Sequence, residues 1–179
     1  MSEEAKRVIT LDREDGLSPR VALLYSMMEK VRGRLFSRIE SLSDVDIDYS
    51  PHGRSIETIG TLLFHIAAVE WSWIFEDIGG KEMDYEKWKQ AFPLREDIDQ
   101  LTGQRVEFYF DRLNEVRQEV LEWLRGIDDE ELDRLIDLGH AEVSIEWVLF
   151  HLIEHEAMHI GQISVLSRMY DMTRVQATD

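Results

Sequence analysis

The sequence predicts an all-α protein, a single four-helix bundle of 179 residues. Four segments of about 25 residues each carry apolar side chains at alternating spacings of three and four, the pattern of an amphipathic helix. The only prolines, Pro19, Pro51 and Pro93, all lie outside these segments. No internal repeat, low-complexity tract or Pro/Gly-rich linker divides the chain. We therefore expect one domain over residues 1–179, with residues 1–15 as a flexible N-terminal segment.

The first two helices are placed by their capping residues and their apolar stripes. The first should begin after Ser18, because a capping serine followed by proline is a favoured helix start, and its stripe extends to Ile39. The second should follow Ser55, a candidate N-cap, and end at the glycine pair that begins with Gly79.

The third helix is expected over residues 97–125, and the fourth from Ser144 to Met169 or beyond. A short extra helical turn should precede the fourth helix, opened by Asp128 with Glu131 as its capping partner. The connection between the second and third helices is long enough to cross back along the bundle. This length permits an up-down-down-up order of the helices.

Composition excludes several classes of function. The net charge of −17 repels phosphate backbones and anionic lipid heads, so neither a nucleic acid nor a membrane is an expected partner. The chain contains no apolar run of signal-peptide or membrane-spanning type, and a cytoplasmic location is expected. There is no cysteine, which excludes disulfides, thiolate ligands and a catalytic thiol. Any metal ion must be held by His, Asp or Glu.

The histidines are the strongest candidates for such ligands. His155 and His159 lie four residues apart, which on a helix is about 40° around the axis and about 6 Å along it, so their rings point the same way. Both continue the apolar stripe of the fourth helix, where sharing a cation would offset their desolvation. His65 lies at a similar depth in the second helix. We expect His65, His155 and His159 to bind one divalent ion and leave a position open, although His65 alone could be a hydrogen-bonded core residue.

The run from His155 to His159 also reads H-E-x-x-H, the zinc-protease signature in which the glutamate is the general base. No histidine or glutamate follows as a further ligand, so a metalloprotease is the weaker alternative. Glu156 is the candidate general base, or it supports the ligands from behind, or it is a solvated residue. We expect His151 to support the site rather than to bind the ion.

The segments IGTLLFH, which ends at His65, and HEAMHIGQI, which begins at His155, resemble those of the DinB/YfiT-like superfamily of bacterial helical-bundle proteins. The resemblance implies an up-down-down-up bundle that forms a homodimer. It also implies a divalent ion on the three histidines, zinc or nickel in the first place, with iron or manganese as alternatives.

What the resemblance implies about activity is broader, because the family includes thiol-dependent transferases and a hydrolase. We expect a metal-dependent transferase or hydrolase that acts on a small-molecule substrate. An open position on the ion suits water or a thiolate, and a low-molecular-weight thiol would have to be a cosubstrate, since the chain has no cysteine. The alternative is a non-enzymatic, stress-related dimeric module with a structural metal, so the sequence leaves open whether the protein is an enzyme.

Overall fold

The computed structural model describes residues 8–51, 56–92, 94 and 100–176. Four long helices form the bundle: α1 (Pro19–Ile39), α3 (Ile59–Trp71), α5 (Val106–Leu124) and α6 (Ile145–Gln176). The connections contain α2 (Asp44–Ile47), α4 (Tyr85–Trp88), the 3-10 turns η3 (Lys89–Ala91) and η4 (Glu131–Asp133), and a hairpin of β1 (Leu135–Asp137) and β2 (Glu142–Ser144). The predicted all-α bundle is confirmed.

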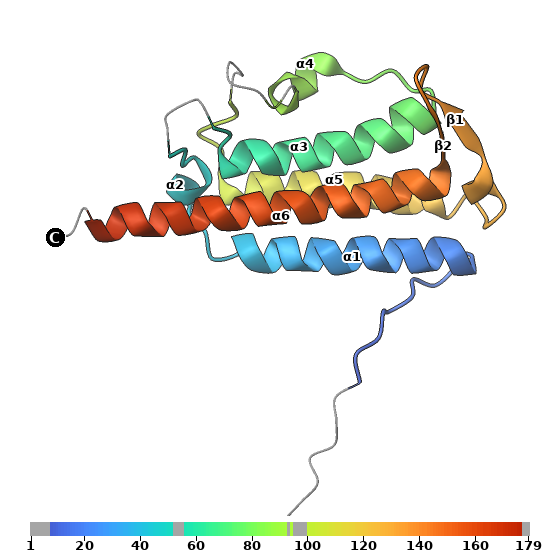
Figure 1. Ribbon diagram of the computed structural model, residues 1–179, viewed down its shortest axis with the longest axis horizontal. Helices are drawn as coiled ribbons and strands as arrows, with labels where there is room; N and C mark the ends of the chain where they lie inside the picture. The colour runs from blue at the N-terminus through green and yellow to red at the C-terminus, as the bar shows by residue number, and fades with distance from the viewer. Residues whose placement is uncertain (1–7, 52–55, 93, 95–99, 177–179) are drawn as a thin grey trace, which may run out of the picture.

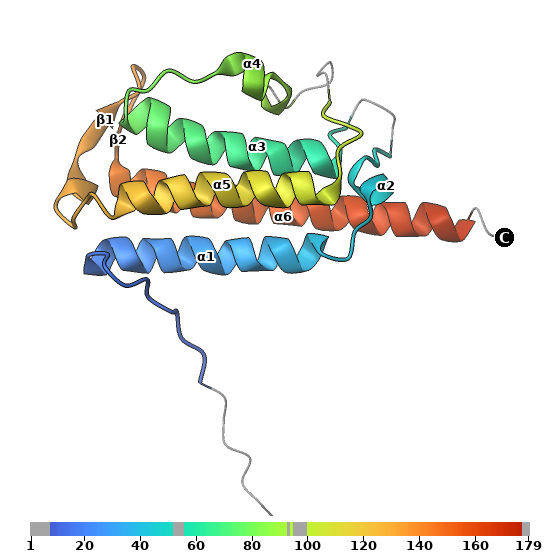
Figure 2. The same ribbon diagram turned by 180° about the vertical axis from the view of Figure 1, so that it is seen from behind.

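The helices follow the up-down-down-up order. In Figure 1, α1 and α6 run in one direction and α3 and α5 run in the other, and the view from behind in Figure 2 agrees. α3 packs against both α5 and α6, while α1 packs against α6. Within the described ranges, no helix combines the length and the apolar character that crossing a lipid bilayer requires.

The parallel arrangement of α3 and α5 forces the chain to return along the bundle between them. The described part of this return passes along the outside of α3 and contains α4 and η3 (Figure 1). Trp88 anchors it, since its indole is buried and lies 4.8 Å from the ring of Phe64, centroid to centroid. The return thereby brings Ala91 against α3.

α3 is the central helix, because all its residues except His65 are buried. A helix that is apolar all round is expected only in the interior of a fold. At Gly60 the approach of α5 is so close that a Cβ atom would overlap the hydroxyl group of Tyr109. Glycine is therefore required there by packing and not by backbone conformation.

Two predicted helix starts are corrected. α3 begins at Ile59, and Thr58 is its N-cap, with a side chain that accepts a hydrogen bond from the Thr61 backbone N–H; the predicted cap Ser55 lies outside the described residues. α5 begins at Val106 rather than at residue 97. Leu101 is buried although it is not helical. Its position extends the apolar spacing of α5 toward the N-terminus, and this is why the sequence predicted an earlier start.

Other connections differ in part from the prediction. The extra turn before α6 is confirmed as η4, but it begins at Glu131 with Glu130 as its N-cap. Asp128 accepts hydrogen bonds from the backbone N–H groups of Glu130 and Glu131, whereas the side chain of Glu131 accepts from Arg134 and is not a capping partner. The hairpin of β1 and β2, with Leu135 opposite Ser144, was not predicted. Residues 8–14 have no regular secondary structure, while residues 1–7 of the predicted flexible segment lie outside the described residues. The flexibility of the N-terminal segment stays a prediction.

Candidate metal centre

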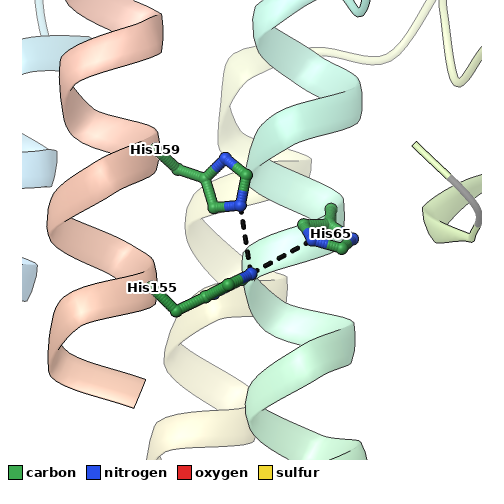
Figure 3. A group of neighbouring side chains, drawn as sticks. All are labelled: His65, His155 and His159. Carbon is green, nitrogen blue, oxygen red and sulfur yellow. Dashed lines mark hydrogen bonds between the residues drawn. The ribbon is translucent and has the colours of Figure 1, made fainter. Parts of the chain in front are cut away.

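Three imidazole rings from two helices converge between α3 and α6. The Nε2 atom of His155 lies 3.1 Å from Nε2 of His65 and 3.0 Å from Nε2 of His159 (Figure 3). All three candidate ligand atoms lie within 4.8 Å of one another. His159 is buried, whereas His65 and His155 are half-buried, so the cluster lies at the edge of the core.

The outer nitrogens of two rings fix where their protons are. Nδ1 of His65 lies 2.8 Å from the carbonyl oxygen of Ala91, and Nδ1 of His159 lies 2.6 Å from Oε1 of Gln162. Both oxygens are acceptors, so each Nδ1 donates and each Nε2 keeps a lone pair that faces His155. A single N–H on His155 can satisfy only one of these lone pairs.

A divalent cation fits this donor set better than hydrogen bonding among the rings does. Histidine nitrogens bind zinc at about 2.0–2.1 Å, so two nitrogens on one ion are roughly 3 Å apart when the angle at the ion is near 95°. Two of the three separations, 3.0 and 3.1 Å, match this spacing, and the pair formed by His65 and His159 would have to close from within 4.8 Å around a single ion. Histidine ligands in proteins usually donate their second N–H to a carbonyl or carboxylate oxygen, as His65 and His159 do here.

The electrostatics keep the rings neutral, which is the state that binds metal ions. Burial lowers the pKa of His65 to about 4, opposed by the hydrogen bond to the Ala91 carbonyl and aided by the neighbouring His159. Burial, together with the neighbouring histidines, lowers the pKa of His155 to about 3. Burial also lowers the pKa of His159, although the hydrogen bond to Gln162 and the charge of Glu57 oppose this. At neutral pH no protonation has to be undone before a cation binds.

Glu156 does not lie with these histidines. Arg32 Nε contacts its Oε1 at 2.7 Å, and Arg117 Nη2 contacts its Oε2 at 3.3 Å. The side chain is almost fully buried. The structure thus places the predicted general base in the centre of the bundle, with both carboxylate oxygens held by arginines.

These arginines belong to an ion-pair cluster. Its four buried members, one from each long helix, are Arg32 (α1), Glu70 (α3), Arg117 (α5) and Glu156 (α6). The more exposed Glu29 of α1 also contacts Arg117 at 2.6 Å. Glu70 contacts both Arg32 and Arg117 at 2.6 Å. Burial alone would raise the pKa of Glu70, but Arg117 and Arg32 outweigh burial and lower it. The lowered pKa keeps Glu70 ionised between the two guanidinium groups.

Sequence reasoning missed this cluster, although a signal for it exists. Arg32 lies between Met28 and Leu35 at the spacing of the apolar stripe, so a charge interrupts a core-facing position. Glu156 does the same between Leu152 and His159. Buried charges require partners, so two cations and two anions on four core stripes could have been paired in advance.

His151 does not join the three converging rings. Its imidazole stacks on Trp147 with a centroid distance of 5.0 Å and an interplanar angle of 2°. Trp73 meets it edge-on at 5.3 Å, and the ring of His155 lies 6.1 Å away. His151 is therefore part of an aromatic stack one helical turn from His155, and its supporting role stays a prediction.

Comparison with known proteins matches this chain to a protein family and to bacterial relatives. A family model described as the DinB superfamily matches residues 27–163, which include all three converging histidines. Two relatives from Bacillus subtilis (strain 168) cover most of the chain. The uncharacterized protein YkkA is 23% identical over 163 residues, or 88% of this chain and 92% of its own length. The uncharacterized protein YizA is 28% identical over 164 residues, or 83% of this chain and 87% of its own length.

Two solved structures share the fold. YfiT from Bacillus subtilis, described as a probable metal-dependent hydrolase with an unusual four-helix bundle topology, has a TM-score of 0.61 at 20% identity, with 94% of each chain covered. A conserved protein from Enterococcus faecalis has a TM-score of 0.63 at 17% identity, with 82% of this chain and 94% of the other covered. At this level of identity the two structures support the fold alone.

Proposed function

Because the chain belongs to the DinB superfamily, we propose that it is a metal-dependent hydrolase of small molecules, with one divalent ion held by His65, His155 and His159. The observation that carries the proposal is the convergence of three Nε2 atoms, two of which have their lone pairs fixed by acceptors behind the rings. The description of YfiT as a probable metal-dependent hydrolase supports the same reading.

The chain's own contribution is a neutral, partly accessible set of ligands. Three uncharged imidazoles leave a bound ion its full positive charge, and three ligands leave at least one coordination position open. When bound, such an ion polarises substrate carbonyl groups and makes water a nucleophile near neutral pH. His65 and His155 are half-buried, so a small molecule can reach the cluster without unfolding of the bundle. Imidazole ligands suit zinc and nickel, the ions we propose first.

The ligand assignment is tested by metal analysis of purified protein. We expect about one divalent ion per chain and a loss of most of it in His65→Ala, His155→Ala and His159→Ala. His140→Ala is the matched control, because His140 is exposed in the loop of the hairpin and should not affect metal content. Equal metal content in all four variants would contradict the assignment.

The activity is tested with a panel of small esters and amides. Turnover should disappear with a chelator, return when zinc or nickel is added back, and be absent in His155→Ala. Product analysis with a low-molecular-weight thiol present distinguishes hydrolysis from transfer to the thiol, which would use the same open position. The structural, non-enzymatic alternative would be favoured if added metal raised the melting temperature of this protein while the protein turned over no substrate of the panel.

A further inference from the structure

An apolar pocket of about 490 Å³ lies beside the candidate metal centre. It is formed by the C-terminal half of α6 and the start of α3, and its apolar walls include Leu62, Met158, Val165 and Met169. Met158 and Val165 are 56% and 54% exposed. Exposed apolar side chains around a concave surface are typical of a site that binds an apolar group.

The pocket shares a residue with the surroundings of the metal centre. Gln162 lines the pocket, and its Oε1 accepts the hydrogen bond from Nδ1 of His159. A molecule in the pocket therefore lies one residue away from a candidate metal ligand. This proximity distinguishes the pocket from the polar surface hollow around Gly33 on α1, where Lys30, Arg34 and Arg38 supply most of the lining charge.

Gly161 forms part of the pocket wall and has no structural need to be glycine. It lies in the interior of α6, where glycine is less favourable than alanine because it costs backbone entropy. A Cβ atom there would meet nothing within 4 Å among the atoms of the protein. The missing side chain leaves the helix backbone open to the pocket, as is expected where a ligand approaches the main chain closely.

Glu57 gives the pocket a charge preference. Glu57 is half-buried and lines the pocket, and its carboxylate has neither an ion pair nor a hydrogen bond with the residues that the structure describes. The chain as a whole carries a net charge of −17, which adds to the attraction of a cation. An apolar group with a positive charge at its edge satisfies both the walls and this carboxylate.

We propose that this pocket binds the apolar, amine-bearing part of the substrate that is processed at the neighbouring metal centre. The inference rests on the proposed function, since it assigns a substrate class to the same site. Apolar atoms would lie against Met158, Val165 and the bare backbone at Gly161, and the ammonium group would face Glu57.

The probe is n-octylamine, titrated calorimetrically into the metal-loaded full-length protein, with n-octanoate as the matched anion. We expect octylamine to bind roughly tenfold more tightly than octanoate, because one ligand is attracted by Glu57 and the other is repelled. Gly161→Leu should weaken octylamine binding by about tenfold or more, since its side chain would occupy the pocket. Gly33→Leu is the control for adding leucine at an open helical glycine and should not change binding.

Glu57→Gln provides a second variant that leaves the helix backbone untouched. It should bring the affinities for octylamine and octanoate to within about twofold of each other. Unchanged octylamine binding in Gly161→Leu, or an unchanged preference in Glu57→Gln, overturns the inference. The inference is also overturned if octylamine does not bind and light scattering shows a different molecular mass for Gly161→Leu. That result would assign this face to contact with a second copy of the chain.

Failure of the inference is distinguishable from failure of the proposed function. Octylamine binding without turnover on any substrate supports the pocket and removes the hydrolase. Chelator-sensitive hydrolysis that octylamine does not inhibit keeps the hydrolase and overturns the assignment of the pocket to its substrate.

Discussion

The Nε2 atoms of His65 and His155 lie 3.1 Å apart, although the two residues are separated by 90 positions in the chain. A slip of α6 by a single residue would move His155 by about 1.5 Å along the helix axis. Metal–ligand distances tolerate only about 0.2 Å, so the alignment of α6 against α3 has to be fixed elsewhere. Glu156, next to His155 in sequence, is bound to Arg32 and Arg117, which also bind Glu70 of α3, so this cluster ties α6 to α3.

Replacing Glu156 by Gln should strongly destabilise the fold. The change leaves Arg32 and Arg117 with one carboxylate too few in the core, and breaking a buried ion pair in this way costs about 3–5 kcal/mol. The measurement is the free energy of unfolding in urea. Glu154→Gln is the control, because Glu154 lies two residues away on the exposed face of α6 and its replacement should change stability by about 0.5 kcal/mol or less.

The same variant separates two roles of Glu156. A Glu156→Gln protein that keeps its stability and metal content but loses hydrolysis would identify Glu156 as the general base and contradict our placement of it in the ion-pair cluster.

Gln162→Leu should weaken metal binding about 10–100-fold, as is common when the partner of a metal-binding histidine is removed. The Gln162 Oε1 atom accepts from Nδ1 of His159 and thereby holds the ring with its Nε2 toward His155. Competition with a chromogenic chelator measures the affinity. Gln118→Leu, on the exposed face of α5, is the control, and an equal affinity in both variants would show that the hydrogen bond does not orient the ligand.

Metal-free protein should lose stability as the pH falls from 6.5 to about 4.5. The pKa of His65 is about 4 and that of His155 about 3, against an ordinary value of 6.5, so the unfolded chain takes up protons before the folded protein does. The stabilisation by the neutral rings is complete above pH 6.5 and is lost as the pH falls below it. For His65 alone the loss is about 2–3 kcal/mol.

Most of the change in this interval comes from the histidines, because Glu70 loses most of its own stabilisation below its ordinary value of 4.5. Urea titrations at pH 7 and pH 4.5, with chelator present, measure the difference. His65→Asn should reduce it and His140→Asn should not. A wild-type protein equally stable at both pH values would contradict the burial of neutral rings.

Gly60→Ala and Gly33→Ala should change stability in opposite directions. A methyl group at Gly60 overlaps Tyr109, and overpacking of this kind costs about 1–3 kcal/mol. At Gly33 a Cβ meets nothing within 4 Å, so alanine there should stabilise α1 by about 0.5–1 kcal/mol. Melting temperatures of the two variants provide the measurement. Stabilisation by both would mean that α3 and α5 are less closely packed at Gly60.

The bundle could be predicted from sequence because apolar residues recur at helical spacing in all four long helices, whether one face is buried, as in α1 and α5, or nearly the whole surface, as in α3. The start of α5 could not be predicted, because the buried Leu101 lies at helical spacing from the apolar residues of α5 without being part of that helix. Burial of a residue in a connecting segment produces the same apolar spacing as a helix. The hairpin of β1 and β2 escaped prediction because three-residue strands are too short to show an alternating pattern.

The candidate site was predictable to the extent that local helical geometry determines it. A spacing of four residues fixes the relation of His155 to His159, and the matching stripe on α3 indicated His65. The acceptor for His65 was not predictable, since it is a main-chain carbonyl of Ala91 and no side chain signals it. Glu156 was misleading because it follows a candidate ligand directly, yet about 100° around the helix separates their directions.

The long connection between α3 and α5 matters for any attempt to shorten the loops of this protein. A tight turn after α3 would make the next helix an antiparallel neighbour and would shorten the protein. Here the long return delivers the Ala91 carbonyl to the back of the His65 ring. A trimmed chain could keep every histidine and every core side chain and still let that ring rotate, so its cation affinity would drop without any ligand having been changed.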